Sequence, residues 1–266
     1  MTERVFHYID THTHLDDEQF KDDIDVVLSE AANAGVTRMI NIGYDPLRWE
    51  STRLLAAREP RVSFTLGLHP SSADQWSDSV SESLAYLVTS TGPVAVGEIG
   101  LDYHWTSDNK ALQRTCFQAQ IELAFRSDLP IVVHQRSAAS DVASILRNAP
   151  PDLRVLLHSF DGDPELGTLA RDRGWTIGVG GLMTRRQNER LRDCLSSLSL
   201  NKIVLETDSP YLVPSGVKAR RNTPAAIPLI AERLSSATGW EVADIARRTT
   251  ANAMEFFEIG TPEMPS

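Results

Sequence analysis

The chain has 266 residues, of which 41% are apolar, and its mean hydropathy is −0.23. This length suits one large α/β barrel or two ordinary domains, and no apolar run approaches the length of a membrane span. The formal net charge of −10 argues against a protein that coats nucleic acid through many phosphate contacts. It leaves a phosphate-containing substrate open, because bound divalent cations and a few arginines can reverse the local potential.

The remaining bulk features favour a cytoplasmic protein of one domain. The opening residues 1–5 lack the basic and then apolar layout of a secretory signal. The two cysteines, Cys116 and Cys194, stand in helix-like stretches and are too few for a disulfide framework. No Pro/Gly/Ser linker divides the sequence, so we expect a single domain over residues 1–266.

Short β-branched runs alternate with longer stretches of helical period, as expected when crossover helices join parallel strands. The pattern predicts strands at residues 5–10, 38–42, 62–68, 94–98, 131–134, 154–158, 175–179 and 202–206. Helices are predicted between them, for example over residues 109–127, and an additional helix is predicted over residues 240–257. Eight such units predict an α/β protein with a single (β/α)8 TIM-type barrel and an extra C-terminal helix.

Side chains that can bind a metal or transfer a proton follow these strands, where barrel enzymes build their active sites. In strand order they are His12, His14, His69, Glu98, His134, His158 and Asp208. Taken singly, each also fits a hydrogen-bonded structural role. Together they are costly to bury at one barrel mouth unless something pairs them, and a metal centre does that.

Strand alternation adds two carboxylates behind these candidates. Residues two apart in an extended chain point to the same side, so Asp10 is expected on the face of His12 and His14. The same rule places Glu206 on the face of Asp208. Asp10 and Glu206 are therefore predicted to orient metal ligands from behind.

Basic residues are frequent in the loops after the seventh and eighth predicted strands, where barrels often bind phosphate: Arg185, Arg186, Arg190, Lys218, Arg220 and Arg221. Arg136, Arg220 and Arg221 are the preferred phosphate contacts, because the guanidinium fork matches phosphate oxygens. The alternative is a solvated rim. Aromatic residues predicted on the same rim either stack on bases or simply pack: Tyr103, Trp105, Phe160 and Tyr211.

Eight short motifs follow one another along almost the whole chain. They are DTHTHLD at 10–16, GLHP at 67–70, GEIGLDY at 97–103, PIVVHQR at 130–136, HSF at 158–160, ETDSPYL at 206–212, RRNTP at 220–224 and NA at 252–253. In this order they resemble the TatD-like deoxyribonucleases, metal-dependent hydrolases with an amidohydrolase-like barrel. Ser159 and Thr223 depart from the family's usual Cys and Glu, and neither replaces an expected ligand.

The resemblance implies a set of metal ligands. One divalent ion would be held by His12, His14, Glu98 and Asp208, and a second by Glu98, His134 and His158. Glu98 would bridge the two ions, and Asp208 would also act as general base. His69 is expected to touch phosphate instead of metal. The mixed nitrogen and oxygen ligands suit Zn²⁺, Mn²⁺ or Fe²⁺ at least as well as Mg²⁺, so the metal stays open.

The sequence therefore predicts a divalent-metal-dependent hydrolase of phosphodiester bonds, acting as an exonuclease on single-stranded DNA ends as the resemblance suggests. DNA is the expected partner, with no membrane and no obligate protein partner. Two alternatives stay open: a two-metal hydrolase of a small amide, lactone or phosphoester, and a barrel that has lost its chemistry. Many small-molecule relatives bridge their metals with a carboxylated Lys, and the absence of Lys at the predicted strand ends favours the nuclease.

Overall fold

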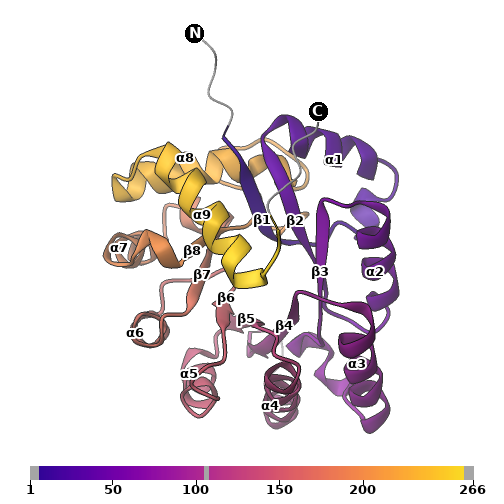
Figure 1. Cartoon of the computed structure of the whole chain (residues 1–266). Helices are drawn as coiled ribbons and strands as arrows, with labels where there is room; N and C mark the ends of the chain where they lie inside the picture. Colours follow the sequence, from indigo (N-terminus) through magenta and orange to yellow (C-terminus); the bar gives the residue numbers. More distant parts are fainter. Residues whose placement is uncertain (1–5, 105–107, 261–266) are drawn as a thin grey trace.

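Parallel strands and surrounding helices form a ring in the computed structural model, which describes residues 6–104 and 108–260 (Figure 1). Each strand pairs in parallel with the next one along the chain: β1 (Tyr8–Thr13), β2 (Val36–Gly43), β3 (Val62–Leu66), β4 (Ala95–Asp102), β5 (Ile131–Arg136), β6 (Val155–Leu157), β7 (Thr176–Val179) and β8 (Ile203–Leu205). The α-helices are α1 (Ile24–Asn33), α2 (Trp49–Arg58), α3 (Asp78–Thr91), α4 (Lys110–Arg126), α5 (Ala139–Arg147), α6 (Pro164–Arg173), α7 (Glu189–Ser197), α8 (Ile227–Thr238) and α9 (Val242–Phe257).

The last strand joins the first. The backbone N–H of Asp208 donates to the carbonyl of His12 at 2.9 Å, and His14 N–H donates to the carbonyl of Ser209 at 2.8 Å. Thr13 and Ser209 form a parallel bridge between these two bonds. The predicted (β/α)8 barrel is therefore confirmed, and its closure places the residues after β8 directly beside those at the end of β1.

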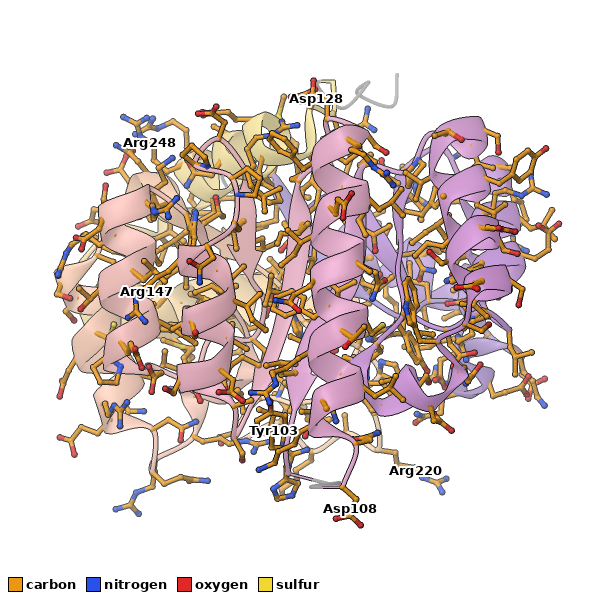
Figure 2. The ribbon with its side chains drawn as sticks, turned by 90° about the horizontal axis from the view of Figure 1, so that it is seen from below. Tyr103, Asp108, Asp128, Arg147, Arg220 and Arg248 are labelled. Atoms are coloured by element: carbon orange, nitrogen blue, oxygen red, sulfur yellow. The ribbon has the colours of Figure 1, made fainter. Side chains whose placement is uncertain are left out.

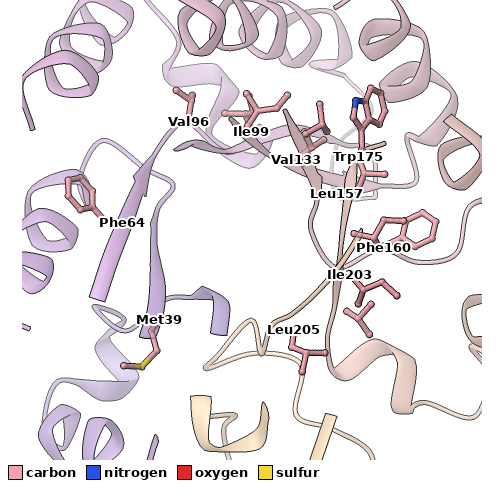
Figure 3. Close-up of a cluster of buried hydrophobic side chains, with 14 of the residues drawn as sticks. Met39, Phe64, Val96, Ile99, Val133, Leu157, Phe160, Trp175, Ile203 and Leu205 are labelled. Carbon is pink, nitrogen blue, oxygen red and sulfur yellow. The ribbon is translucent and has the colours of Figure 1, made fainter. Parts of the chain in front are cut away.

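Apolar side chains fill two layers. One lies between the strands and the outer helices, and Figure 3 shows part of it, including Met39, Phe64, Ile99 and Trp175. The other fills the barrel interior with Ile9, Ile40, Ile42, Ala95, Val132, Leu156 and Val204, and it includes Phe256 and Phe257 of α9. Because α9 lies across the amino-terminal opening of the barrel (Figure 1), the polar interior at the other end is left for a site.

The predicted elements are found, with different ends. α4 and α9 lie within two residues of the predicted ranges 109–127 and 240–257. The first strand runs from Tyr8 to Thr13 instead of ending at residue 10, and Val5, its predicted start, lies outside the described residues. No helix in the described part of the chain is long and apolar enough to cross a membrane.

Simple alternation fails along β1. Ile9 lies in the barrel interior, where it belongs to the same apolar cluster as Val204 of β8. Strict alternation along β1 would place Ile9 on the face opposite to His12. The pairing of β1 with β2 shifts register between Asp10 and Thr13. Such an irregularity changes which side a residue faces, and this lets both Ile9 and His12 lie inside the barrel.

Candidate metal centre

Glu98 of β4 lies at the centre of the polar end of the barrel, with only 4% of its surface exposed. Its Oε1 is 2.8 Å from Nδ1 of His134, at the end of β5, and 3.7 Å from Nε2 of His158, directly after β6. Its Oε2 is 3.3 Å from Nε2 of His12 in β1. One carboxylate thus faces imidazoles that come from three different strands.

Asp208 supplies a second carboxylate beside the first. Its Oδ1 lies 3.2 Å from Nε2 of His14 and 3.7 Å from Nε2 of His12. The backbone at Asp208 is left-handed, with φ 57°, a conformation that Asp adopts more readily than most residues. His12 therefore lies between the two carboxylates of Glu98 and Asp208.

Buried nitrogens without partners indicate that these groups fit a cation. Both ring nitrogens of His12 and Nδ1 of His14 are buried and have no hydrogen-bond partner among the described residues. Buried polar atoms are normally paired, and a neutral imidazole offers one lone pair, so a cation bound by one nitrogen of each ring accounts for one unpartnered nitrogen in each histidine. Three groups have ligand atoms within 4.8 Å of one another: His12, His14 and Asp208; His69, Glu98 and His134; and His12, His158 and Glu206.

The ionisation of the two carboxylates supports the same interpretation. Burial alone would raise the pKa of Glu98, but the nearby His12 and His158 hold it well below its usual value. Burial also opposes ionisation of Asp208, and His14 and His158 lower its pKa. Both carboxylates are therefore ionised at neutral pH, as metal ligands must be.

The histidines divide into neutral and charged rings. Burial and the neighbouring His158, whose ring stacks on His12 at 3.4 Å, lower the pKa of His12. Burial lowers the pKa of His158 too, but Glu206 and Glu98 outweigh it and raise that pKa to about 10. The carboxylates thus attract positive charge to this position, which a divalent cation supplies as well as a proton does.

Glu206 lies behind His158, in the place predicted for an orienting carboxylate. Its Oε1 is 3.1 Å from Nδ1 of His158 and accepts the backbone N–H of Ser159 at 2.6 Å. A Cβ at Gly178 of β7 would lie 2.2 Å from Oε2 of Glu206. Only glycine at that position leaves room for the carboxylate.

Asp10 occupies a different position from the predicted one. Its Oδ1 accepts the backbone N–H groups of His12 at 3.3 Å and Thr207 at 2.9 Å, and its Oδ2 accepts the Thr207 hydroxyl at 2.5 Å. Asp10 therefore holds the backbones of β1 and of the segment after β8 together, and these bonds do not involve the His12 ring. Burial raises its pKa to about 8, against the effect of the hydrogen bonds from Thr207 and His12.

His69, which the sequence predicted to touch phosphate instead of metal, lies beside Glu98 and His134. Its Nε2 is 3.9 Å from Oε1 of Glu98, and its ring centre is 4.4 Å from that of His134. Sequence reasoning missed Asp102, whose Oδ2 lies 3.2 Å from Nε2 of His134. Its signal was present in the sequence, because Asp102 follows Glu98 by four residues along the same strand.

Two of the three predicted phosphate contacts, Arg136 and Arg220, are exposed at the barrel end that carries the candidate metal centre. Figure 2 shows Arg220 and Tyr103 at one end of the barrel, and Asp128 and Arg248 at the opposite end. Arg136 ends β5 on the Arg220 side, and Arg136 and Arg220 are both exposed. These two arginines therefore lie at the same barrel end as Glu98.

Arg221 is engaged within the protein. Its guanidinium donates to the side chain of Asp23 and to the carbonyl of Gln19, and it stacks over the Phe20 ring at 4.7 Å. The structure thus ties Arg221 to the segment after β1, a contact between distant parts of the chain that the local sequence does not reveal.

The aromatic residues predicted on the rim lie in different environments. Phe160 is 4% exposed and belongs to the layer between strands and helices, so the prediction that it lies on the rim is wrong. Tyr211 is 43% exposed, and its ring centre is 5.7 Å from that of His14. The hydroxyl of Tyr103 donates to Asp141 at 2.6 Å. Trp105 lies outside the described residues.

A TIM barrel that gathers histidines and ionised carboxylates at the carboxyl ends of its strands is the architecture of metal-dependent hydrolases. A family model described as "TatD related DNase" matches residues 9–258. The "uncharacterized metal-dependent hydrolase YabD" of Bacillus subtilis is 31% identical over 256 residues, covering 94% of this chain and 98% of that protein. The chain belongs to the TatD-related DNase family, as its motifs predicted.

Further relatives agree with this assignment. The "3'-5' ssDNA/RNA exonuclease TatD" of Pantoea ananatis is 32% identical over 257 residues, covering 94% of this chain and 99% of that protein. The crystal structure of YJJV, a TatD homolog from Escherichia coli, has a TM-score of 0.89 at 29% identity, covering 97% of this chain and 100% of that one. A TatD-family hydrolase structure from Entamoeba histolytica, at 22% identity and a TM-score of 0.85, supports the fold.

Proposed function

We propose that this protein hydrolyses phosphodiester bonds at the ends of single-stranded DNA. The observation that carries the proposal is the position of Glu98, which lies between His12, His134 and His158 with Asp208 adjoining. The name of the Pantoea ananatis relative, an exonuclease on single-stranded DNA and RNA, supports the substrate class.

The two oxygens of Glu98 face different histidines, Oε2 towards His12 and Oε1 towards His134 and His158, which supports two divalent ions bridged by Glu98. The first ion would be held by His12, His14, Glu98 and Asp208, and the second by Glu98, His134 and His158. Such ions, when bound, acidify a water molecule and stabilise charge on a phosphoryl oxygen. Nitrogen and carboxylate ligands in this mixture suit Mn²⁺ or Zn²⁺ as well as Mg²⁺.

Asp208 is the residue best suited to take the proton of the attacking water. Its carboxylate is ionised, and its side chain is 17% exposed, compared with 6% for Glu98. A carboxylate that is both ionised and reachable from the mouth can act as a general base.

His69 is suited to donate a hydrogen bond to a phosphate oxygen. Its Nδ1 accepts the backbone N–H of Ser71 at 3.1 Å, and burial together with His134 lowers its pKa to about 3. The ring is therefore neutral with its proton on Nε2, the nitrogen that faces Glu98 at 3.9 Å. A protonated Nε2 is a donor and no metal ligand, which supports a contact with substrate. Arg136 and Arg220 would contact phosphates further out.

The test is digestion of an end-labelled single-stranded DNA oligomer by the full chain, with and without Mg²⁺ or Mn²⁺. We expect a ladder that requires metal and that disappears in the Asp208→Asn variant. Asp244→Asn, on the exposed start of α9, is the matched control and should give the wild-type ladder. Intact DNA with metal-loaded wild type would overturn the proposal and make a small amide, lactone or phosphoester the leading substrate class.

A further inference from the structure

Charge is distributed unevenly between the two halves of the barrel. Positions 1–110 contain 18 acidic and eight basic residues, whereas positions 111–266 contain 18 of each. The whole formal charge of −10 thus belongs to the half built from β1 to β4 with α1 to α3, coloured indigo to magenta in Figure 1. A polyanion that approaches the barrel mouth is repelled more by this half than by the other.

The loops at the barrel mouth also differ in charge. Residues 180–188, which follow β7, and residues 209–226, which follow β8, contain no acidic residue. The segment after β1, by contrast, carries Asp16, Asp17, Glu18, Asp22 and Asp23 within eight positions. Arg48, Lys21 and Arg221 pair with Asp16, Glu18 and Asp23 of this segment. The loops after β7 and β8 therefore offer a phosphate backbone a more favourable surface than the neighbouring segment after β1 does.

Four cations on the acid-free loops have no partner within the described structure. They are Arg185 and Arg186 after β7, and Lys218 and Arg220 after β8; none forms a hydrogen bond or ion pair through its side chain with another described residue. Arg186, Lys218 and Arg220 are exposed, and Arg185 is half-buried. Their charge is thus available to a ligand from solution.

The loop after β7 is held in place from behind by Arg192 of α7. Nη1 of Arg192 donates to the carbonyls of Met183 at 3.1 Å and Arg185 at 2.8 Å, and Nη2 donates to the carbonyl of Arg186 at 3.1 Å. One guanidinium therefore fixes the backbone that carries both neighbouring arginines.

The two loops also contact each other. The backbone N–H of Ser215 donates to the hydroxyl of Thr184 at 2.8 Å, and a Cβ at Gly181 would lie 2.1 Å from the carbonyl oxygen of Leu212. The loop after β8 begins beside Asp208, a member of the central ligand group. The four cations thus lie on a joined surface that starts at the metal centre.

We propose that the loops after β7 and β8 form the track along which a single-stranded nucleic acid leaves the metal centre, held through its phosphates by Arg185, Arg186, Lys218 and Arg220. Cations spread over two loops fit several phosphates in succession better than one. The acidic segment after β1 borders the loop after β8, which contacts it through Arg221 and Asp23, and it limits the track on that side. The track deepens the proposed function, on which it rests for what happens at the end of the strand, and binding along it is measurable without cleavage.

The experiment compares two triple variants in an Asp208→Asn chain, which keeps bound DNA uncut. The track variant is Arg186→Gln, Lys218→Gln and Arg220→Gln. The control is Arg173→Gln, Lys202→Gln and Arg248→Gln, which removes the same charge away from these loops. Binding of a fluorescein-labelled oligothymidine is measured by anisotropy over a series of salt concentrations with Mn²⁺ present.

We expect the dissociation constant of the track variant to rise at least tenfold, with a salt slope shallower by about 2, since each contact with a single strand contributes about 0.7. The control should stay within about twofold. Equal affinity of both variants, or no binding by the parent chain, would overturn the track. If only the track variant loses binding but the wild type leaves DNA intact, the track is supported and the proposed nuclease activity is contradicted. If the wild type digests DNA but both variants bind it equally well, the nuclease activity is supported and the track is contradicted.

Discussion

The carboxylate of Glu206 holds the His158 ring from behind. Oε1 of Glu206 lies 3.1 Å from Nδ1 of His158 and is itself anchored by the N–H of Ser159 at 2.6 Å. This arrangement leaves Nε2 of His158 on the side of Glu98, 3.7 Å from Oε1. The contact both orients the ring and increases its basicity, which would strengthen His158 in its proposed role as a metal ligand.

Glu206→Gln should therefore weaken metal binding while it preserves the size of the side chain beside Gly178. We expect the affinity for Mn²⁺ or Zn²⁺ to fall by about 10–100-fold, measured by competition with a chromophoric chelator. Glu232→Gln, an exposed position on α8, is the control and should bind like the wild type. Unchanged affinity in Glu206→Gln would show that the His158 ring needs no support from this carboxylate.

His69→Asn separates a phosphate contact from a metal ligand. If Nε2 of His69 donates to a phosphate oxygen, kcat/KM for oligonucleotide digestion falls by about 10–100-fold, because hydrogen bonds to charged groups contribute about 1.5–3 kcal/mol. The number of bound metals, measured by elemental analysis, should stay the same. A variant that loses a metal ion would place His69 among the ligands, together with Glu98 and His134.

Gln120 of α4 is a buried anchor for the residue before His69. Its Oε1 accepts the N–H of Leu68 at 2.7 Å, and its Nε2 donates to the carbonyl of Leu68 at 3.1 Å. Gln120→Leu leaves both backbone groups buried without partners, so we expect the free energy of unfolding to fall by about 2 kcal/mol or more. Gln118→Leu, exposed on the same helix, should change it by less than about 0.5 kcal/mol. Urea denaturation measures both, and equal stabilities would contradict the anchor.

Glu59 makes a pH-dependent contribution to stability. Hydrogen bonds from Arg61, two of them at 2.8 Å, hold the pKa of Glu59 below its usual value. Because the pKa is lower in the folded state, the stabilisation is present above the unfolded pKa, about 4.3, and is lost as the pH falls through the folded one.

Glu59→Gln should accordingly be less stable than wild type by about 0.5 kcal/mol at neutral pH, with the difference shrinking as the pH falls below about 4. Glu50→Gln is the matched control, since Glu50 also pairs with an arginine, Arg53, but its side chain is 64% exposed against 17% for Glu59. Chemical denaturation at several pH values provides the comparison. A difference that grows on acidification has the opposite sign and contradicts the assignment.

Much of the fold was readable from the sequence because strand and helix periods differ and the barrel repeats one unit. The buried runs around Val132 and Val204 gave the strands, and helical spacing gave α4 and α9. The carboxyl end of β1 was missed, because His12 and Thr13 lie in the strand through the bond from the segment after β8 and the pairing of Thr13 with β2. Local periodicity does not contain those contacts.

The candidate site was readable to a similar extent. Histidines and carboxylates at successive strand ends placed Glu98 and its neighbours together, since all strands of a parallel barrel end at the same mouth. Contacts across the sequence were not accessible. Arg221 pairs with Asp23, and Gln120 anchors Leu68, through proximity that only the folded chain creates.

Metal stoichiometry tests the central claim most directly, which is that Glu98 joins two ions in one centre. Purified wild type, equilibrated with Mn²⁺ or Zn²⁺ and freed of unbound ions, should contain two ions per chain by elemental analysis. The Glu98→Ala variant, with its fold checked by circular dichroism, should retain one at most, because both ligand groups lose the same carboxylate. A wild type with a single ion, or a Glu98→Ala variant that keeps two, would contradict the account.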